Sequence, residues 1–373
     1  MLIGVPKEIK NHEYRVGMTP AGVQELVMAG HTVIVEIGCG DAIGFSDQDY
    51  YNAGATLLAS ATEIFLRAEM IVKVKEPQPE ECKRLRYDQI LFTFLHLAPD
   101  PEQAKLLLAS GATCIAYETV TDAAGGLPLL APMSEVAGRM AIQAAAHCLE
   151  KAQGGRGVLL GGVPGVEPAR VVVIGGGVVG IHAARMAIGL GADVTILDCS
   201  LSRLKIIDEN FNGRIKTLFS NKTAIEAQLR EADAVIGAVL IPGAAAPKLV
   251  TREMLLLMKR GSVLVDVAID QGGCFATSRA TTHENPTYIV DGIIHYCVAN
   301  IPGAVARTST MALTNATLPF VMELAQKGAR QALLDNIHLR NGLNVYRNVY
   351  TCCAVAEALG EKYVTSETAL KII

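Results

Sequence analysis

The sequence predicts two α/β domains, each a doubly wound parallel sheet with helices on its faces. Short runs rich in Val, Ile and Leu alternate with helical stretches over residues 1–118, as is typical of parallel sheets. The same alternation starts again near residue 170, after the glycine-rich connection GGRGVLLGGVPGVEPA. A chain of 373 residues also forms two domains more often than one.

The first part of the chain supplies five predicted strands. The strand LIGV precedes a helix with Thr19 as its N-cap, Pro20 at its first position and Gly30 past its end. The following elements are predicted in order: the strand HTVIVEIG, helical stretches near 47–53 and 61–68, the strand MIVKV running to Lys75, the strand QILFTFL, the helix PEQAKLLLASG and the strand ATCIAYE.

Three unlike polar residues follow strands of this first part. Arg15 lies in the loop after the first strand, Lys75 follows the third strand and His96 follows the fourth. Ligands of open parallel sheets bind beyond the carboxyl ends of the strands, so this placement indicates a site. Spacing alone leaves two alternatives open, because Arg15 and Lys75 could be solvated charges and His96 a satisfied core histidine.

A glycine pattern opens the second part. Residues 133–150 are predicted to form a long helix, and the glycine-rich connection follows it. Gly175, Gly177 and Gly180 then form G-x-G-x-x-G between the strand 171–174 and a helix over residues 178–190. These glycines permit a tight turn, a close backbone approach to a pyrophosphate and close helix–strand packing, which predicts a Rossmann dinucleotide site. The free N–H groups at the start of the helix would bind the phosphates.

An acidic residue ends the next strand and bears on the choice of cofactor. Asp198 follows DVTIL, where it can accept both ribose hydroxyls of an adenosine and would repel a 2′-phosphate. NAD is therefore favoured, although Arg203 nearby leaves NADP open. Further strands are predicted in IKTLF, DAVIGAVL, SVLVDVAID and TYIV. The third of these ends at Asp270, where the nicotinamide of a bound NAD should lie; a helix cap or solvated loop acid is the alternative for this residue.

Composition and charge exclude several classes of function and location. Half of the residues are hydrophobic, 19% are charged and the formal net charge is −4, without a basic stripe, so nucleic-acid binding is disfavoured. The N-terminal segment has lysines but no apolar stretch of a signal peptide, and the most apolar run, 171–181, is too short to span a bilayer. The nine cysteines include no C-x-x-C pair, which favours reduced thiols in a cytoplasm.

Several long motifs resemble those of the bacterial alanine dehydrogenase family. They are IGVPKEIKNHEYRVGMTPAGV, VPGVEPARVVVIGGGVVG, SVLVDVAIDQGG and HYCVANIPGAVARTSTMALTNATLPF, and the resemblance covers nearly the whole chain. It implies reversible NAD-dependent oxidative deamination of L-alanine to pyruvate and ammonia. It also implies a cytoplasmic homohexamer; from the residues themselves we expect no metal and no membrane partner. A discontinuous substrate domain, 1–130 with 305–373, and a Rossmann NAD domain, 131–304, would then enclose a cleft.

The resemblance also implies residue roles. Arg15 and Lys75 would bind the substrate carboxylate and carbonyl oxygen, His96 would be the acid/base and Asp270 the second active-site group. The implied cofactor contacts are Ser134, Gly175, Gly177, Val178, Val179, Gly180, Asp198, Arg203, Ser220, Val239, Leu240, Val267, Ala268, Ile269, Asp270, Arg279, Val298 and Asn300. Arginine suits a carboxylate, lysine a carbonyl and histidine a proton transfer near neutral pH.

Two other functions remain open at this stage. The NAD(H)-binding subunit of proton-translocating transhydrogenase resembles the same family but has no amino-acid chemistry. A relative with the same chemistry could also act on another amino acid. The sequence departs from the family pattern at Ala306, where a proline is expected, and at the adjacent Cys352 and Cys353. Glu323 and Lys327 do not predict a metal site, because lysine is a poor ligand for hard cations.

Overall fold

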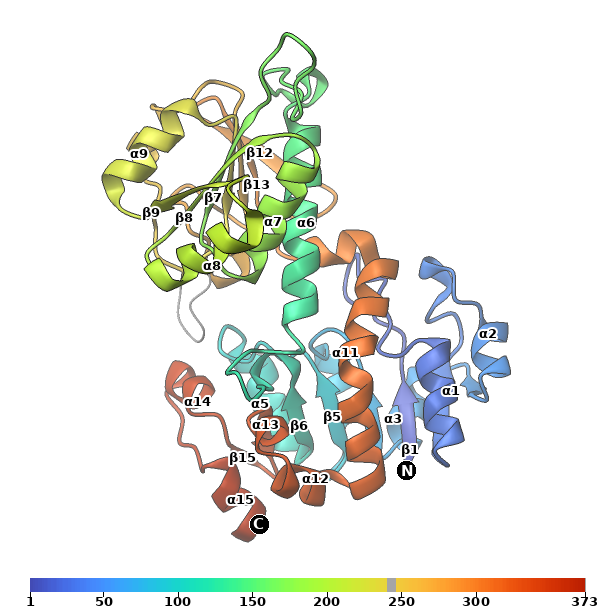
Figure 1. Ribbon diagram of the computed structural model, residues 1–373. Coiled ribbons are helices and arrows are strands. Elements are labelled where there is room, and N and C mark those ends of the chain that lie inside the picture. Colours follow the sequence, from blue (N-terminus) through green and yellow to red (C-terminus); the bar gives the residue numbers. More distant parts are fainter. Residues whose placement is uncertain (240–245, 373) are drawn as a thin grey trace. The chain divides into compact units, whose positions relative to one another are not determined.

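The computed structural model describes residues 1–239 and 246–372, which divide into two compact units. Unit 1 comprises residues 1–133 and 305–373, and unit 2 comprises residues 134–304. In Figure 1 the blue to teal segments and the orange to red segments beyond residue 304 belong to unit 1, and the green, yellow and pale orange segments between them in the chain belong to unit 2. Within the described ranges, no helix is both long and apolar enough to cross a membrane.

Unit 1 is built on an eight-stranded sheet in the order β15-β14-β6-β5-β4-β1-β2-β3. Its strands are β1 Leu2–Val5, β2 Thr32–Glu36, β3 Thr56–Leu58, β4 Met70–Val72, β5 Ile90–Thr93, β6 Thr113–Ala116, β14 Leu343–Tyr346 and β15 Val349–Tyr350. The pairs from β3 to β6 are parallel, whereas β14 is antiparallel to both β6 and β15. The predicted α/β class is confirmed, but the sheet is mixed at this edge, where the C-terminal strands β14 and β15 join it.

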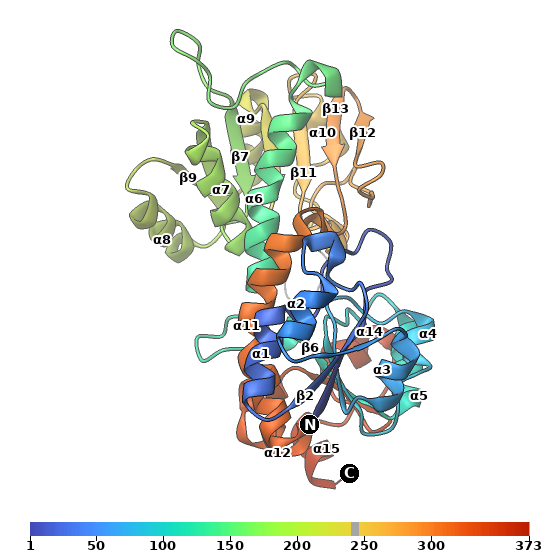
Figure 2. The same cartoon turned by 90° about the vertical axis from the view of Figure 1, so that its right-hand side faces the viewer.

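Helices cover both faces of the unit 1 sheet. They are α1 Pro20–Met28, α2 Asp47–Asn52, α3 Ala61–Arg67, α4 Pro79–Cys82, α5 Pro101–Ser110, α11 Ala306–Lys327, α12 Ala329–Asp335, α13 Ile337–Arg340, α14 Cys353–Leu359 and α15 Ser366–Ile372. Figure 2 shows α1, α11 and α12 on one side of the strands and α3, α4 and α5 on the other. The predicted cap of α1 is confirmed: Thr19 accepts the Gly22 N–H, and Gly30 has a φ of +88°.

Unit 2 contains a seven-stranded sheet in the order β12-β13-β11-β10-β7-β8-β9. Its strands are β7 Arg170–Ile174, β8 Asp193–Asp198, β9 Lys216–Phe219, β10 Ala234–Gly237, β11 Val263–Asp266, β12 Thr287–Val290 and β13 Ile293–Tyr296. Only the edge pair β12–β13 is antiparallel among these strands. The helices are α6 Ala131–Cys148, which begins in unit 1, α7 Val178–Gly189, α8 Leu201–Phe211, α9 Lys222–Glu231 and α10 Arg252–Leu255.

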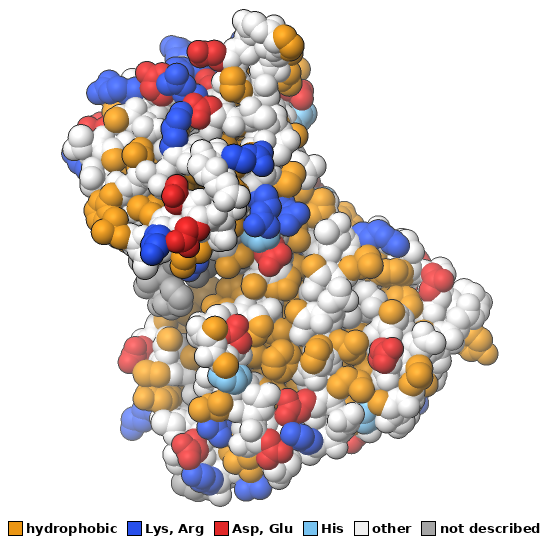
Figure 3. Space-filling view, viewed as in Figure 1, with side chains coloured by type: hydrophobic (Ala, Val, Ile, Leu, Met, Phe, Trp, Pro, Cys, Tyr) orange, Lys and Arg blue, Asp and Glu red, His pale blue; other side chains and the backbone are white. Residues whose placement is uncertain are grey.

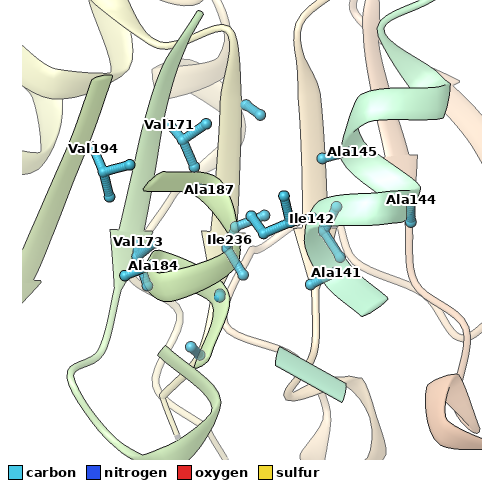
Figure 4. Close-up of a cluster of buried hydrophobic side chains, with 14 of the residues drawn as sticks. Ala141, Ile142, Ala144, Ala145, Val171, Val173, Ala184, Ala187, Val194 and Ile236 are labelled. Carbon is cyan, nitrogen blue, oxygen red and sulfur yellow. The ribbon is translucent and has the colours of Figure 1, made fainter. Parts of the chain in front are cut away.

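Alternate residues of each unit 2 strand face opposite layers, because side chains of a strand point to alternate sides. Val171 and Val173 of β7 join a cluster with α6 and α7, whereas Val172 and Ile174 pack with residues of α9 and α10. Figure 4 shows Ala141, Ile142 and Ala145 of α6 with Ala184 and Ala187 of α7 at the first of these layers. Small side chains let these two helices approach, since a Cβ on Gly138 would lie 2.3 Å from the Val179 carbonyl oxygen.

The structure corrects several predicted element bounds. Strand β4 ends at Val72 and β5 at Thr93, so Lys75 and His96 both lie in loops just beyond strands. The predicted strand ending at Asp270 ends at Asp266, and Asp270 lies in a 3₁₀ turn, Ile269–Gln271. The predicted helix 133–150 runs from Ala131 to Cys148. Strands β3, β13, β14 and β15 were not predicted. β3 and β15 have only three and two residues, and β13 and β14 belong to antiparallel hairpins, which an alternation of strands and helices does not reveal.

The residues that depart from the family pattern have local explanations. Ala306 is the first residue of α11, a position where alanine and proline are both compatible with a helix. Cys352 precedes α14 and packs against the unit 1 core, and the Cys353 thiol donates to Glu357 Oε1 at 3.2 Å. Lys327 pairs with Glu323 at 3.0 Å, as a surface ion pair of α11.

Candidate functional site

The polar residues of unit 1 follow neighbouring strands at its topological switch point. The chain winds from β1 through β2 to β3 and then returns to the other side of β1 with β4, β5 and β6. Arg15 follows β1, Lys75 follows β4 and His96 follows β5, and these three strands are adjacent. The carboxyl ends of parallel strands meet at one edge, so the structure brings the three predicted residues to the position where such sheets bind ligands.

A close backbone contact brings the loop of Arg15 against the end of β4. A Cβ on Gly17 would lie 2.4 Å from the Val72 carbonyl oxygen, so only glycine fits this approach. The Val16 N–H donates to Thr310 Oγ1 of α11 at 3.2 Å. The loop is therefore fixed by the sheet and by the helix that returns from the end of the chain.

Arg15 is buried and paired, so its interpretation as a solvated charge is wrong. Its side chain is 3% exposed. Its Nε and Nη2 donate to the two carboxylate oxygens of Glu13 at 2.7 and 2.6 Å, and its Nη1 lies 3.2 Å from the Met133 sulfur. The guanidinium plane is thereby fixed by two parallel hydrogen bonds to one carboxylate.

Lys75 is also largely buried, and it lies in a cluster of charged side chains with Glu76 and Lys10, which were not predicted to belong to the site. Its Nζ lies 3.8 Å from Glu76 Oε2, while Lys10 pairs with Glu76 Oε1. Burial lowers the pKa of Lys75 below its ordinary value, against the opposing effect of Glu76. Burial raises the pKa of Glu76, but Lys75, Lys10 and His96 together bring it below its ordinary value. The lowered pKa favours the ionised form of the Glu76 carboxylate beside these cations.

His96 lies half-buried at the end of β5. Its ring stacks on Phe94, with centroids 5.6 Å apart and planes 4° from parallel, and its φ of +48° is in the left-handed region. Within the described residues of unit 1, no hydrogen bond to the imidazole is found. A core histidine would be enclosed and satisfied, so this geometry favours the proton-carrier interpretation.

A second ion network is buried beneath Lys75. Lys73 is 0% exposed and donates to Glu8 and Glu81 at 3.0 and 2.8 Å. Glu8 Oε1 also accepts the N–H groups of Val74 and Lys75, at 2.7 and 3.2 Å. This network therefore fixes the backbone that carries Lys75.

The glycine turn of unit 2 has the geometry that a dinucleotide requires. Gly175 has a φ of +106°, and a Cβ on Gly180 would lie 1.8 Å from the Gly175 carbonyl oxygen. A Cβ on Gly177 would meet nothing within 4 Å, so open space adjoins the backbone there. Helix α7 starts at Val178 directly after this turn, with Val179 in its first turn. A pyrophosphate would fill the open space at the helix N-terminus.

Asp198 lies beside this turn at the end of β8. Its Oδ2 accepts the Gly176 N–H at 2.7 Å, and its Oδ1 accepts the Ser200 N–H at 2.8 Å. Each carboxylate oxygen can accept more than one hydrogen bond, so both retain capacity for ribose hydroxyls. The Ser220 N–H donates to the Asp198 carbonyl at 2.9 Å, and Arg203 is exposed close to Gly176. These residues fit an adenosine ribose.

The remaining predicted cofactor contacts follow neighbouring strands of the same sheet. Val239 follows β10 and lies against Gly175 at the switch point between β7 and β10. Residues 267–270 follow β11, with Asp270 exposed, and Val298 and Asn300 follow β13. Arg279 stacks on the Tyr288 ring at 4.1 Å. Of the other predicted cofactor contacts, Ser134 lies in α6, and Leu240 lies outside the described residues.

The predicted residues thus fall into two groups. Arg15, Lys75 and His96 gather in unit 1, whereas Asp270 and the cofactor set belong to unit 2. Sequence reasoning missed the carboxylates that contact Arg15, Lys75 or His96, namely Glu8, Glu13, Glu76 and Glu118. Two of them could have been found by the rule that ligand-binding residues follow strands. Glu76 follows β4, and Glu118 follows β6.

The fold and the site define a two-unit α/β protein with a dinucleotide-binding turn. Residues 4–137 match the family described as "Alanine dehydrogenase/PNT, N-terminal domain", and residues 141–352 match the corresponding C-terminal domain. The chain belongs to the alanine dehydrogenase/PNT family.

Relatives match over nearly their whole length. An alanine dehydrogenase from Halomonas elongata is 65% identical, covering 98% of this chain and 98% of that protein. One from Bacillus subtilis is 56% identical, covering 100% and 98%. A solved L-alanine dehydrogenase structure has a TM-score of 0.93 at 52% identity, covering 96% and 99%. A transhydrogenase structure from Sinorhizobium meliloti is more distant, with a TM-score of 0.81 at 25% identity, covering 94% and 100%.

Proposed function

We propose that the protein is an NAD-dependent L-alanine dehydrogenase. The reaction converts L-alanine, NAD⁺ and water to pyruvate, ammonium, NADH and a proton, and it runs in both directions. The similarity to alanine dehydrogenases over nearly the full length of both chains carries this proposal. The similarity to the transhydrogenase structure is more distant, at 25% identity. A nucleotide-binding subunit without amino-acid chemistry would also have no use for the basic residues and the histidine at the unit 1 switch point.

We assign the substrate to unit 1 and the cofactor to unit 2. Arg15 would bind the substrate carboxylate, and Lys75 would donate to the carbonyl or imine. NAD, when bound, accepts the hydride from the substrate carbon. His96 would move the protons as water adds to the imine and ammonia leaves, and Asp270 would stabilise the cationic imine. Among the described unit 1 residues, Lys10 and Lys75 both lie beside Glu76, and Arg15 pairs with Glu13.

We further propose a cytoplasmic homo-oligomer, a hexamer. All nine cysteines are free thiols, which favours a reducing compartment. Figure 3 shows hydrophobic side chains gathered over the unit 1 surface near α11, and Met311 of that helix is 47% exposed. Extended apolar surface of this kind is usually covered by another chain. Light scattering of the purified protein tests the number of subunits.

The reaction is tested by a panel of amino acids. We expect NADH formation to be fastest with L-alanine, and NADH oxidation to require both pyruvate and ammonium. Turnover of no amino acid, with NADH binding retained, would favour the nucleotide-binding alternative. A clear preference for a longer side chain would instead identify a relative with another substrate.

The carboxylate at the end of β8 should set the choice of cofactor. In the wild type we expect NAD to be strongly preferred, because Asp198 would repel the 2′-phosphate of NADP. Asp198→Ala should weaken NAD binding and narrow the ratio of kcat/KM values for the two cofactors. Equal wild-type activity with NAD and NADP would contradict the assignment.

The open space at Gly177 provides a test of the pyrophosphate position. Gly177→Ala should fold normally, because its φ of −71° suits alanine and the new Cβ meets no protein atom. NADH affinity, measured by fluorescence titration, should fall about 10-fold or more, since the methyl group takes the space of the phosphate. Gly189→Ala is the matched control, because that helical glycine also has open space around it. An equal effect in both variants would exclude the site.

The lowered pKa of Lys75 predicts an alkaline limit to substrate binding. Its ammonium must stay protonated to donate to the substrate, so KM for pyruvate should begin to rise at a lower pH than the ordinary lysine pKa of 10.5 would give. Glu76→Gln removes a charge that raises this pKa, so the rise should move to lower pH. Lys75→Arg should bind pyruvate less well but lose the alkaline rise, because a guanidinium stays charged. An unchanged pH dependence in both variants would assign the limit to another group.

A further inference from the structure

A carboxylate at the end of β6 contacts the backbone that carries His96. Glu118 lies in the 3₁₀ turn Tyr117–Thr119, directly after β6, and β6 is the neighbour of β5. Its Oε1 accepts the His96 N–H at 2.7 Å, and both of its oxygens lie 3.2 Å from the Leu95 nitrogen. One side chain therefore satisfies two successive N–H groups at the point where the chain leaves the sheet.

This contact supports a backbone conformation that histidine rarely adopts. His96 has a φ of +48°, in the left-handed region, which is unfavourable for a residue with a Cβ. Such a conformation persists only where its surroundings hold it. Two successive N–H groups facing one anion form an arrangement of that kind, and charge-assisted hydrogen bonds are about twice as strong as neutral ones.

The same end of β6 also supports the imidazole through packing. Tyr117, the residue before Glu118, contacts Phe94 edge-on with centroids 5.1 Å apart, and Phe94 stacks on the His96 ring. On the other side, Gln103 Nε2 of α5 donates to the Leu95 carbonyl at 3.0 Å. The position of the ring thus depends on the backbone hydrogen bonds to Glu118 and Gln103 and on the aromatic stack that Tyr117 supports.

We propose that Glu118 is a positioning residue that acts through His96. The inference rests on the proposed function, because it assigns His96 the proton transfers of alanine oxidation. Glu118 itself has its carboxylate directed at the backbone of Leu95 and His96, so its contribution is the placement of the imidazole. Misplacement of a reacting group by about 1 Å can cost about 100-fold in rate. Loss of Glu118 should therefore reduce turnover without removing the acid/base group.

The test is a double-mutant cycle between Glu118 and His96, with L-alanine and NAD as substrates. Glu118→Ala should lower kcat about 10- to 100-fold while KM for alanine and NADH affinity change less than about threefold. In the His96→Ala background, the same substitution should have almost no further effect on kcat, because the group that it positions is absent. Glu102→Ala, an exposed carboxylate on α5, is the control and should leave every parameter unchanged.

Conservative variants separate positioning from general structural support. Glu118→Gln keeps a carbonyl oxygen for the His96 N–H and should recover most of kcat, whereas Glu118→Asp is one methylene shorter and should recover little. If Glu118→Ala does not fold, the difference between these two variants decides. Normal kcat per folded molecule in Glu118→Ala or Glu118→Asp, or equal losses in both His96 backgrounds, would overturn the inference. A wild type inactive with every amino acid would instead refute the proposed function.

Discussion

His96→Ala should fold, bind NADH normally and lose about 10²- to 10⁴-fold in turnover of L-alanine, the usual contribution of a general acid/base. Oxidation leaves an imine to which water must add, and ammonia must then leave with a proton. Both steps need a group that takes and gives protons near neutral pH, as histidine does and as aspartate and lysine ordinarily do not. The imidazole of His96 is half-buried at the carboxyl end of β5, beside Lys75 and Glu76 in the same unit.

The structure adds an expected effect on stability to this prediction. His96→Ala would keep the backbone and lose only the stack of the imidazole with Phe94, so stability should fall by about 1 kcal/mol. Turnover and thermal unfolding should therefore be measured on the same preparation. A markedly less stable variant with near-normal turnover per folded molecule would return His96 to the core-histidine interpretation. Arg15→Ala and Lys75→Ala serve as companions, since they should also cut turnover and leave NADH binding intact.

Most of the architecture could be predicted because it depends on local patterns. Apolar runs of four or five residues indicated the parallel strands, and G-x-G-x-x-G placed the turn before α7. The rule that ligands bind beyond carboxyl strand ends then located Arg15, Lys75 and His96 at one edge of one sheet. The same rule located Asp270 beyond β11, even though that strand ends four residues earlier than predicted.

The features that could not be predicted depend on contacts distant in sequence. Nothing near Lys75 shows that Glu8 accepts its backbone N–H, and nothing near His96 shows that Glu118 holds its backbone. The antiparallel strand β14 joins the sheet more than 200 residues after β6 in the chain, so alternation does not reveal it. The edge of the sheet at which a charged residue lies could therefore be predicted, but its hydrogen-bond and ion-pair partners could not.

The burial of Lys73 could not be expected without knowledge of its two carboxylate partners. Its sequence context, between Val72 and Val74 at a strand end, gives no sign of a charge in the core. In the structure its Nζ bonds Glu8 and Glu81, and all three side chains are almost completely buried. Burial alone would lower the pKa of Lys73, but the two carboxylates raise it above its ordinary value. The two carboxylates thus favour the charged form of this buried lysine.

Lys73→Met should destabilise unit 1 by about 3–5 kcal/mol, because it leaves Glu8 and Glu81 buried without a cation. Burial already raises the pKa of Glu8, and the substitution removes the ammonium that opposes this rise, so folding of the variant would take up protons. The stability deficit should therefore be largest at neutral and alkaline pH and shrink as the pH falls toward about 5. Urea unfolding followed by circular dichroism at several pH values measures this dependence.

Replacement of all three charges separates the loss of an ion pair from the loss of packing. Glu8→Gln, Lys73→Met and Glu81→Gln together remove the three charges of this network, while the amide oxygen of residue 8 can still accept the N–H groups of Val74 and Lys75. This triple variant should recover most of the stability that Lys73→Met loses, since uncharged replacements of buried ion pairs are often neutral. It should also recover alanine turnover, because Lys75 would regain its backbone support. A triple variant as unstable as Lys73→Met, with a deficit independent of pH, would show that the lysine side chain contributes by packing instead.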